Sequence, residues 1–501
     1  MKKMFSLMML FGLLAMACTP TPDGGGEEPE PTVNPYEELT KGTTVENYKY
    51  APDAPRSPYY YVTVAGEECY VFPMVTNHDK PHITTFGTNG LVRVEITPCM
   101  VTPETVVVRP LAKEYPHWIE DGKIVLYLNE GDKATVEING DEDVPLIVFA
   151  NSLETNKPSP DAEGVVFLEA GKLHDKQAVF TIGAGQTLYI EGGAIMVGAL
   201  QVTLQDNITV AGHGILDDFH VLHDNNSKWA FRLDRCNNAN ISGIVIANMA
   251  GYSCATIMSE GVSFDNVKVI APYNEDHVSG VENGGIAFFA CQHCTVKNFY
   301  SYAHDDTYMV KTNKWSWKGE AKDLLFENCQ AFNVSGGNGY EIGYEVNEGV
   351  DGVTFRDCYV LHSAKSRNNT YRHGSFTIHN STAGTVKNIL YENIYIDDPK
   401  EFDLYISVLP DCNYSLGDGV EWGPGKIENI TFRNVYVHKK APYGEIMFGL
   451  DAEHTVKNVS FENFFIEGEK IDSYEKAGFK VDPRYSSKGY LPIMKNEITF
   501  K

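Results

Sequence analysis

Apolar and polar residues follow one repeated arrangement through the second half of the chain. Each repeat has an apolar residue, two other residues, a second apolar residue, a free position and a final apolar or small residue. The eight repeats begin at Ile241, Phe264, Val296, Phe326, Phe355, Tyr391, Phe432 and Phe461, at spacings of 23 to 41 residues. This pattern indicates a solenoid, because one coil cannot bury its inward face alone and successive coils must stack.

The third and fourth positions of the repeat indicate which solenoid this is. The third is Asn in six repeats, and Asn tolerates left-handed backbone geometry while its amide can bond to the next coil. The fourth is apolar, with Cys329 and Cys358 in neighbouring repeats, so we expect both cysteines to be core residues. A leucine-rich or helical solenoid would show a Leu signature or a helical period, which this chain lacks.

We therefore predict an all-β fold, a right-handed parallel β-helix over residues 156–501. The stretches 187–197 and 207–216 have the pattern of earlier coils. Because the repeats are unevenly spaced, loops of different length should protrude between the strands and build a binding groove.

Before the solenoid, residues 49–155 show short alternating segments separated by turn signals. The segments are 59–64, 91–96, 105–109, 123–128, 135–138 and 146–150, with Asn89-Gly90, Asp121-Gly122 and Glu130-Gly131 between some of them. Several short strands at this spacing predict a small β-sandwich.

The first 48 residues have the composition of a targeting segment and a tether. Lys2 and Lys3 precede an apolar stretch and small residues that lead to Cys18, the layout of a bacterial lipoprotein signal peptide over 1–18. Residues 19–48 are rich in Pro, Gly and Glu, which predicts a flexible linker. We expect an outer-membrane lipoprotein, surface-exposed or periplasmic; ordinary secretion with cleavage nearby is the alternative.

Charge and cysteine content narrow the possible partners. The formal net charge is −26, with no cluster of Lys and Arg, which argues against nucleic acid and weakly against a polyanionic substrate. Without Cys18, nine of the ten cysteines remain, so at least one is free or paired between chains. Cys291 and Cys294 form a lone CxxC, a weak zinc signal that core packing explains better.

The residues best suited to chemistry are two adjacent carboxylates, Asp305 and Asp306, between one strand and the next. Neighbours in a strand point to opposite faces, so both can face a groove only across a bend. Hydrolysis of a glycosidic bond needs one protonated carboxyl and one ionised carboxylate. Crowding pushes the two pKa values apart and so creates both states. A solvated Asp-Asp turn is the alternative.

Asp305-Asp306 followed by Lys311 resembles the G-D-D-x-x-x-x-K segment of bacterial polygalacturonases, glycoside hydrolase family 28. The sandwich before the helix instead resembles dextranases and isopullulanases, family 49. This resemblance implies a right-handed parallel β-helix and an inverting hydrolase in which one Asp is the general acid and the other activates water. It implies no metal and no organic cofactor.

The chain departs from the polygalacturonase pattern at three places. The third Asp of that pattern falls on Gly284, so Glu282 is the nearest candidate for a third carboxylate. Asn338 stands where the pattern has His. The cationic R-I-K motif that binds a uronate has no counterpart in residues 374–379. The resemblance with these departures implies a neutral, α-linked polysaccharide substrate.

Further polar and aromatic residues near the pair are candidate sugar contacts. Aromatic rings offer flat faces to sugar C–H groups, and carboxylates accept bonds from hydroxyls. The candidates are His304, Lys311, Trp315, Trp317, Asn338, Tyr340, Glu341, Glu345, Arg372 and His373. Two other functions stay open: a polysaccharide lyase on the same fold, and a non-catalytic glycan-binding surface lipoprotein that has lost an acid at Gly284.

Overall fold

The computed structural model divides into two units, residues 1–41 and 42–501. It describes residues 34–74, 76, 80–218, 229–248, 252–272, 283–312, 317–333, 336–363, 373–409, 423–486 and 489–501. In the first unit the short helix α1 (Pro35–Leu39) is capped by Asn34, whose side chain accepts from the Tyr36 N–H at 3.0 Å. The predicted signal segment with Cys18 lies outside the described residues. None of the helices described is long and apolar enough to cross a membrane.

The second unit begins with a strand inside the region predicted as linker. β1 (Val45–Asn47) pairs antiparallel with β5 (His82–Thr88), so the sandwich starts before residue 49. The prediction of a linker over 19–48 is therefore wrong at its end. The three residues Val45–Asn47 are too few to show an alternating pattern. They are recognised as a strand only by their pairing with β5.

Two packed sheets make the β-sandwich. One has the order β1-β5-β11-β10-β7 with β4 beside β5, and the other has the order β3-β2-β6-β9-β8. Their remaining bounds are β2 (Tyr60–Val64), β3 (Glu67–Cys69), β4 (Val71–Pro73), β6 (Val92–Pro98), β7 (Val106–Arg109), β8 (His117–Glu120), β9 (Lys123–Leu128), β10 (Lys133–Ile138) and β11 (Asp141–Asn151), with the 3-10 turn η1 (Leu111–Lys113) after β7. The predicted strand 123–128 is β9, whereas β5 was missed because all seven of its residues are buried and no alternation marks it.

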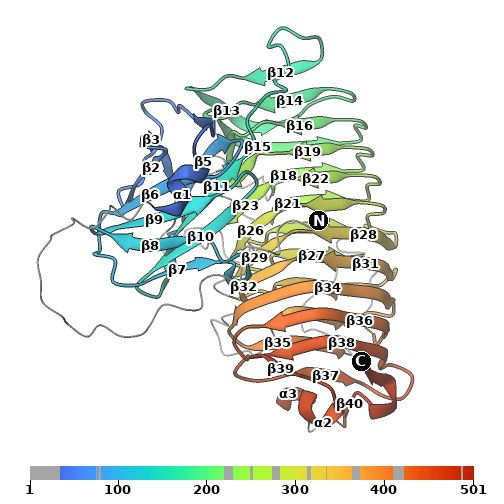
Figure 1. Cartoon of the computed structure of the whole chain (residues 1–501). Helices are drawn as coiled ribbons and strands as arrows, with labels where there is room; N and C mark the ends of the chain where they lie inside the picture. Colours follow the sequence, from blue (N-terminus) through green and yellow to red (C-terminus); the bar gives the residue numbers. More distant parts are fainter. Residues whose placement is uncertain are drawn as a thin grey trace, which may run out of the picture. The chain divides into compact units, whose positions relative to one another are not determined.

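The rest of the unit is a parallel β-helix, drawn in Figure 1 as a stack of coils from β12 to the C-terminus. From β12 to β38 the strands pair in parallel with strands of the next coil, as β12 does with β14, β15 with β17 and β18 with β21, which gives three parallel stacks of strands. At the C-terminal end, β39 and β40 pair antiparallel with β38 and β37. Long strands bend from one sheet into the next. The predicted fold class is confirmed.

The first sheet carries the repeats found in the sequence. Its strands are β12 (Val165–Leu168), β14 (Thr187–Ile190), β16 (Thr209–Ala211), β19 (Asn240–Ser242), β22 (Ser263–Asp265), β25 (Thr295–Lys297), β28 (Ala321–Glu327), β31 (Val350–Arg356), β34 (Thr385–Pro399), β36 (Lys426–Val437), β38 (Val456–Ile466) and β41 (Ile498–Phe500). The second halves of β34, β36 and β38 continue into the second sheet.

The second and third sheets complete each coil. The second holds β13 (Leu173–Phe180), β15 (Ile195–Thr203), β17 (Ile215–Asp217), β20 (Val245–Ala247), β23 (Lys268–Ala271), β26 (Tyr300–Ala303), β29 (Gln330–Asn333) and β32 (Tyr359–Ser363). The third holds β18 (Trp229–Asp234), β21 (Tyr252–Ile257), β24 (Ile286–Phe289), β27 (Tyr308–Lys311), β30 (Tyr340–Tyr344), β33 (Gly374–Asn380), β35 (Phe402–Val408) and β37 (Ile446–Gly449). Beyond them lie β39 (Glu469–Lys470), α2 (Tyr474–Ala477), α3 (Pro483–Ser486), β40 (Leu491–Pro492) and η3 (Lys495–Glu497).

The eight repeat segments stack in the register that the sequence predicts. Their first residues pair in order from Ile241 to Phe461, and Phe500 adds one more level. The rings at Phe326, Phe355, Tyr391, Phe432 and Phe461 stack at centroid distances of 4.7 to 5.1 Å. This column forms part of one continuous interior core.

An asparagine ladder runs beside the aromatic column, at the third repeat position. Asn393, Asn434 and Asn463 have φ of 53° to 57°, and each amide donates to the residue one coil earlier at 2.8 to 3.1 Å. The cysteines also behave as predicted: Cys329 and Cys358 are completely buried in the core. Cys291 and Cys294 lie in the same interior and donate to backbone carbonyls.

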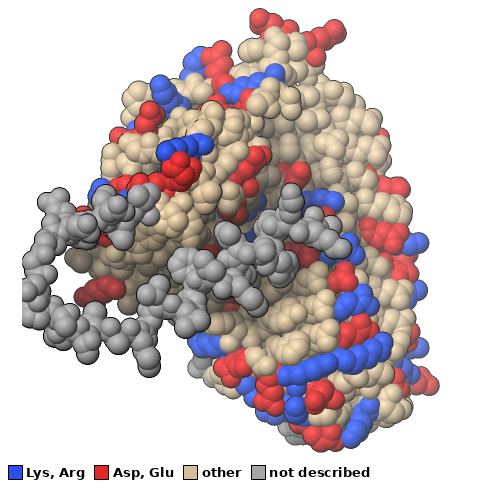
Figure 2. All heavy atoms as spheres, viewed as in Figure 1, with Lys and Arg blue, Asp and Glu red and all other residues tan. Residues whose placement is uncertain are grey.

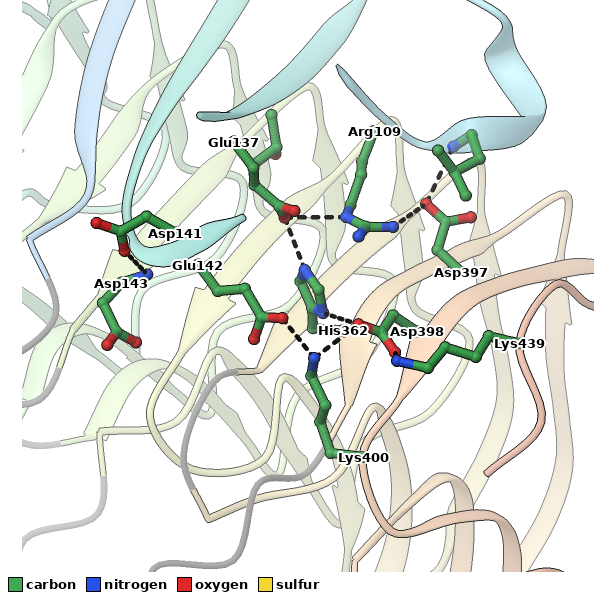
Figure 3. A network of polar contacts seen from close by, with 12 residues as sticks. Arg109, Glu137, Asp141, Glu142, Asp143, His362, Asp397, Asp398, Lys400 and Lys439 are labelled. Atoms are coloured by element: carbon green, nitrogen blue, oxygen red, sulfur yellow. Dashed lines mark hydrogen bonds and ion pairs between the residues drawn. The ribbon is translucent and has the colours of Figure 1, made fainter. Parts of the chain in front are cut away.

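The sandwich packs on the outward face of the second sheet (Figure 1). Ile147 and Phe149 of β11 join Tyr300, Tyr302 and Phe332 of the β-helix in one apolar cluster. Beside this cluster lies the network of Figure 3, in which the Glu137 Oε1 accepts from Arg109 at 2.9 Å and lies 2.6 Å from the His362 Nε2.

Further out in this network, Lys400 joins the two parts of the unit. Its ammonium binds Glu142 at 2.5 Å and Asp398 at 2.6 Å, and Lys439 binds the other oxygen of Asp398 at 2.6 Å. Glu142, His362 and Asp398 bring possible metal-ligand atoms within 4.8 Å of one another. The Lys400 ammonium binds the carboxylates of both Glu142 and Asp398, so it already balances their negative charge.

Candidate active site

The outward face of the third sheet carries the predicted catalytic pair. Strand alternation turns Tyr308 and Val310 of β27 into the core and leaves Met309 and Lys311 outward. The same alternation in β30 turns Glu341 outward, and in β33 it turns Thr377 and His379 outward, because Phe376 and Ile378 belong to the core.

Apolar clusters lie on this face on both sides of its middle coils. Before β27 the outward side chains Ala255, Ala287 and Phe289 form an apolar cluster, and after β33 another cluster forms around Tyr405 and Phe448. Lys311, Glu341 and His379 therefore lie in a polar belt between two apolar regions.

Asp306 lies in the bend before β27. Asn338, one coil further on, donates to the Asp306 Oδ1 from its backbone N–H at 2.9 Å and from its side-chain amide at 2.7 Å. The Asn338 Oδ1 accepts from the Gly374 N–H at 3.0 Å, which fixes the orientation of that amide. Asn338 thus holds Asp306 in place.

Asp306 is only 8% exposed. Burial, and then the negative charge of Glu341, raise its pKa to about 6, against the opposing effects of Lys311 and Asn338. A carboxyl in this state stays protonated in mildly acidic solution, where an ordinary Asp is ionised.

Glu341 is the ionised neighbour of that carboxyl. Burial alone would raise its pKa, but the charge and hydrogen bond of His379, together with Lys311, lower it. The His379 Nδ1 lies 3.0 and 3.1 Å from the two Glu341 oxygens, and the Lys311 ammonium lies 3.3 Å from Glu345. Glu341 and Glu345 are both completely buried, so their contacts hold the site together.

Asp305 and the two predicted histidines lie at the edge of the belt. The Asp305 Oδ1 accepts from the Asp306 N–H at 2.8 Å, which shapes the bend, and the residue is half-buried. His304 is also half-buried. His373 lies before β33, where its Nδ1 is 3.7 Å from Glu401.

Gly284 stands where the polygalacturonase pattern has its third Asp, and its surroundings show what fills that space. A Cβ at this position would lie 2.4 Å from the Met309 Cε and 3.1 Å from the Asp306 carbonyl oxygen. The Met309 thioether therefore takes the space toward which an acid at residue 284 would point. Glu341, in the next coil, pairs in register with Met309. A carboxylate therefore lies next to Met309, although residue 284 carries none.

Two predicted sugar contacts have different surroundings from those expected. Tyr340 lies in the core, where its hydroxyl is 3.2 Å from the carbonyl oxygens of both Cys329 and Tyr359, so its assignment as a substrate contact is wrong. Strand alternation is the reason, because Glu341 next to it points outward. Trp317 packs on Phe289 at a centroid distance of 5.0 Å, one coil before Lys311. Glu282, Trp315 and Arg372 lie outside the described residues.

His379 is the site residue that sequence reasoning missed. It lies two coils after Lys311, and its link to Glu341 depends on the pairing of β30 with β33. The segment Gly-Tyr-Glu-Ile-Gly-Tyr-Glu gave a signal for Glu341, because an acid among apolar strand residues must face outward or be paired.

The site is rich in carboxylates and poor in free cations. Across the described strands β27, β30 and β33, Lys311 is the only lysine or arginine, and it pairs with Glu345. Elsewhere on the molecule, Figure 2 shows acidic and basic side chains mixed over the lower coils.

A parallel β-helix with clustered carboxylates on one outward face, one of them kept protonated, has the arrangement of a polysaccharide-cleaving glycoside hydrolase. The chain belongs to the Glycosyl hydrolases family 28, whose model matches residues 182–480. The resemblance to family 28 that the sequence suggested is therefore confirmed.

One curated protein and two solved structures illustrate what the chain is similar to. The "Probable endopolygalacturonase D" of Neosartorya fischeri is 27% identical over 243 residues, which are 48% of this chain and 44% of that protein. The chain thus spans less than half the length of that relative. Among solved structures, Dex49A from Penicillium minioluteum matches with a TM-score of 0.50 and 13% identity over 91% of this chain and 96% of its own. The polygalacturonase from Erwinia carotovora matches with a TM-score of 0.47 and 14% identity over 66% and 90%.

Proposed function

We propose that the protein hydrolyses an α-linked, neutral polysaccharide with inversion of configuration, and that Asp306 is the general acid. The observation that carries this proposal is the buried Asp306 carboxyl, oriented by Asn338 and protonated up to about pH 6. A general acid must hold a proton at the working pH and must present it at a fixed place.

The neighbouring carboxylates take separate roles. Asp305, half-buried beside the acid, is the candidate to deprotonate the attacking water. Glu341 is buried and acts through Asp306, because its charge favours the protonated form of the acid. Lys311 and His379 keep Glu341 ionised.

The charge of the site supports a neutral substrate. A uronate carboxylate near Asp305 would feel the negative charges of the buried Glu341 and Glu345, and the one lysine of the described strands of the belt is already paired with Glu345. The named relative is an endopolygalacturonase, so polygalacturonate is the substrate to test against this proposal. Dextran and a linear α-galactan are the neutral polymers for comparison.

The test is the initial rate of reducing-end release by wild type, Asp306→Asn and Asp305→Asn. Loss of a general acid should lower the rate by roughly 10²–10⁴-fold, with little change in melting temperature. Asp161→Asn, on an exposed loop, is the matched control. A folded Asp306→Asn protein with a near-wild-type rate would refute the assignment. Faster cleavage of polygalacturonate than of the neutral polymers would refute the substrate, and retention of anomeric configuration in the first product would refute inversion.

We also propose that Cys18 is lipidated and anchors the mature protein to the outer membrane. The Lys2-Lys3 start, the apolar stretch and the small residues before Cys18 support this. Wild type should fractionate with membranes, and Cys18→Ser should release it or stall its processing; identical fractionation of both would refute the anchor.

A further inference from the structure

An aromatic row on the outward face of the second sheet continues beyond the part that the sandwich covers. Tyr359 belongs to the cluster under the sandwich, and it pairs in register with Tyr395 in the next coil. Tyr436 and Phe465 follow in the next two coils. The rings stack at centroid distances of 5.5, 5.3 and 5.5 Å, with interplanar angles of 17°, 16° and 4°.

A groove runs along this exposed end of the row. It has a volume of about 850 Å³, and its floor is formed by Tyr395, Tyr436 and Phe465. One wall is the sandwich turn at Leu111 to Glu114. Tyr436 is 40% exposed, whereas Tyr359 at the covered end is 9% exposed. The exposed rings therefore face an open channel rather than packed protein.

The polar groups of the groove are those that suit sugar hydroxyls. Glu114, His438 and Glu467 line it and are exposed. No lysine or arginine is among the described residues that line it, although Lys113 of the same turn lies 5.2 Å from the centroid of the Tyr359 ring at the covered end. The two glutamates repel an anionic ligand. Because the rings stack on one another, they present apolar edges to the groove. An apolar floor with acceptor groups at the rim matches a neutral sugar, which has apolar C–H faces and hydroxyls at its edges.

The geometry also indicates a chain rather than a single sugar. Three rings in consecutive coils repeat at a nearly constant distance along the stack, so the same contact is offered several times in one direction. The groove lies on the second sheet and the carboxylates lie on the third, so both surfaces can be occupied together.

We propose that this groove is a second carbohydrate-binding surface, which holds a neutral polysaccharide chain along Tyr395, Tyr436 and Phe465. It is separate from the site on the third sheet, and binding to it does not require hydrolysis. Two linked contacts with one polymer would raise its apparent affinity without any new contact at the catalytic site.

The experiment is native affinity electrophoresis in gels that contain dextran, linear α-galactan, β-mannan or polygalacturonate. All proteins carry Asp306→Asn so that the gel polymer is not digested. At least one neutral polymer should retard this parent. Tyr436→Ala with Phe465→Ala should weaken retardation about tenfold, the equivalent of roughly 1.4 kcal/mol, while Tyr436→Phe should keep most of it.

The control is Tyr61→Ala, which removes a 48% exposed ring from the sandwich. Retardation should not change in this variant, and melting curves should show that every variant is folded. Three results would overturn the proposal: no retardation by any neutral polymer, equal retardation after loss of both rings, or stronger retardation by polygalacturonate. Light scattering that shows a dimer which Tyr436→Ala dissociates would also overturn it, by assigning the groove to a second copy. Because binding is measured alone, an inactive wild type would refute the proposed hydrolysis and leave this result standing.

Discussion

At the scale of single residues, Asp306 and Glu341 form a pair of unlike carboxyls on neighbouring coils. As a general acid, Asp306 is active in its protonated form, so kcat/KM should fall as the pH rises above about 6. Glu341→Gln removes a negative charge that favours this protonated form. We expect the high-pH limb of the profile to move to lower pH, by about one unit.

The measurement is kcat/KM against pH for both proteins, on whichever polymer proves to be the substrate. Glu341→Asp, which keeps the charge, should restore part of the wild-type profile, and Glu348→Gln, at an exposed position after β30, should change nothing. A Glu341→Gln enzyme that only loses rate, with an unmoved limb, would show a structural role instead.

The sequence located part of this site. Adjacent carboxylates followed by Lys311 at a fixed interval can be found along the chain, and the structure places Asp306, Lys311, Asn338, Glu341 and Glu345 on neighbouring coils. The contact between Glu341 and His379 spans 38 residues and depends on which strands pair. Tyr340 was assigned to the wrong face because its neighbours in sequence gave no fixed register.

At the scale of elements, the asparagine ladder predicts a specific order of stabilities. Asn434 has a φ of 53°, donates to Asn393 and accepts from Asn463. Asn434→Ala loses both amide bonds and also bears the cost of left-handed backbone, about 1–2 kcal/mol. Asn434→Gly loses the same bonds but tolerates the backbone.

We therefore expect unfolding free energies in the order wild type, Asn434→Gly, Asn434→Ala, with about 1 kcal/mol between the two variants. Denaturant titration measures this order. If both variants lose the same free energy of unfolding, the stabilising effect of Asn434 comes from its amide hydrogen bonds and not from its tolerance of left-handed backbone.

The elements that the sequence predicted best are those in which the same position of the repeat is buried in every coil. Phe264, Phe326 and Phe432 share an interior position, so their spacing gave the register directly. β5 could not be found in this way, because both of its faces are covered and its Thr residues resemble a polar loop.

At the scale of the whole second unit, the polar junction of Figure 3 should make stability depend on pH. His362 is completely buried between Glu137 and Asp398; burial opposes its charge, but these two carboxylates raise its pKa overall. A raised histidine pKa stabilises the fold at low pH, and this stabilisation is lost as the pH rises above about 6.5. The pKa of Asp398 is lowered by His362, Lys400 and Lys439 against burial, so its contribution is lost below about pH 4.

The prediction is that the melting temperature falls between pH 6 and pH 9 and that His362→Gln has a flatter profile over this range. His293→Gln, an exposed histidine outside the junction, is the matched control. Burial also raises the pKa of Asp403 to about 7, which adds a loss of the same sign. The difference between wild type and variant is therefore the decisive quantity, and parallel profiles would contradict the prediction.

The arrangement of the two parts could not be read from the sequence. A β-sandwich and a β-helix were each predicted from local patterns, but Arg109 and Asp397 meet across 288 residues. No periodicity indicates that the sandwich packs on the second sheet.

The buried cysteines of the solenoid can be used to follow its unfolding. Of the eight described, Cys99 is exposed, and Cys236, Cys254, Cys291, Cys294, Cys329 and Cys358 are sealed in the interior at successive levels. In native protein, a thiol-specific reagent should modify Cys99 and spare these six. As denaturant rises, the order in which they become labelled, read by peptide mass spectrometry, would report whether the stack frays from one end or opens all at once. The chain thus carries its own set of positional probes, with no label added.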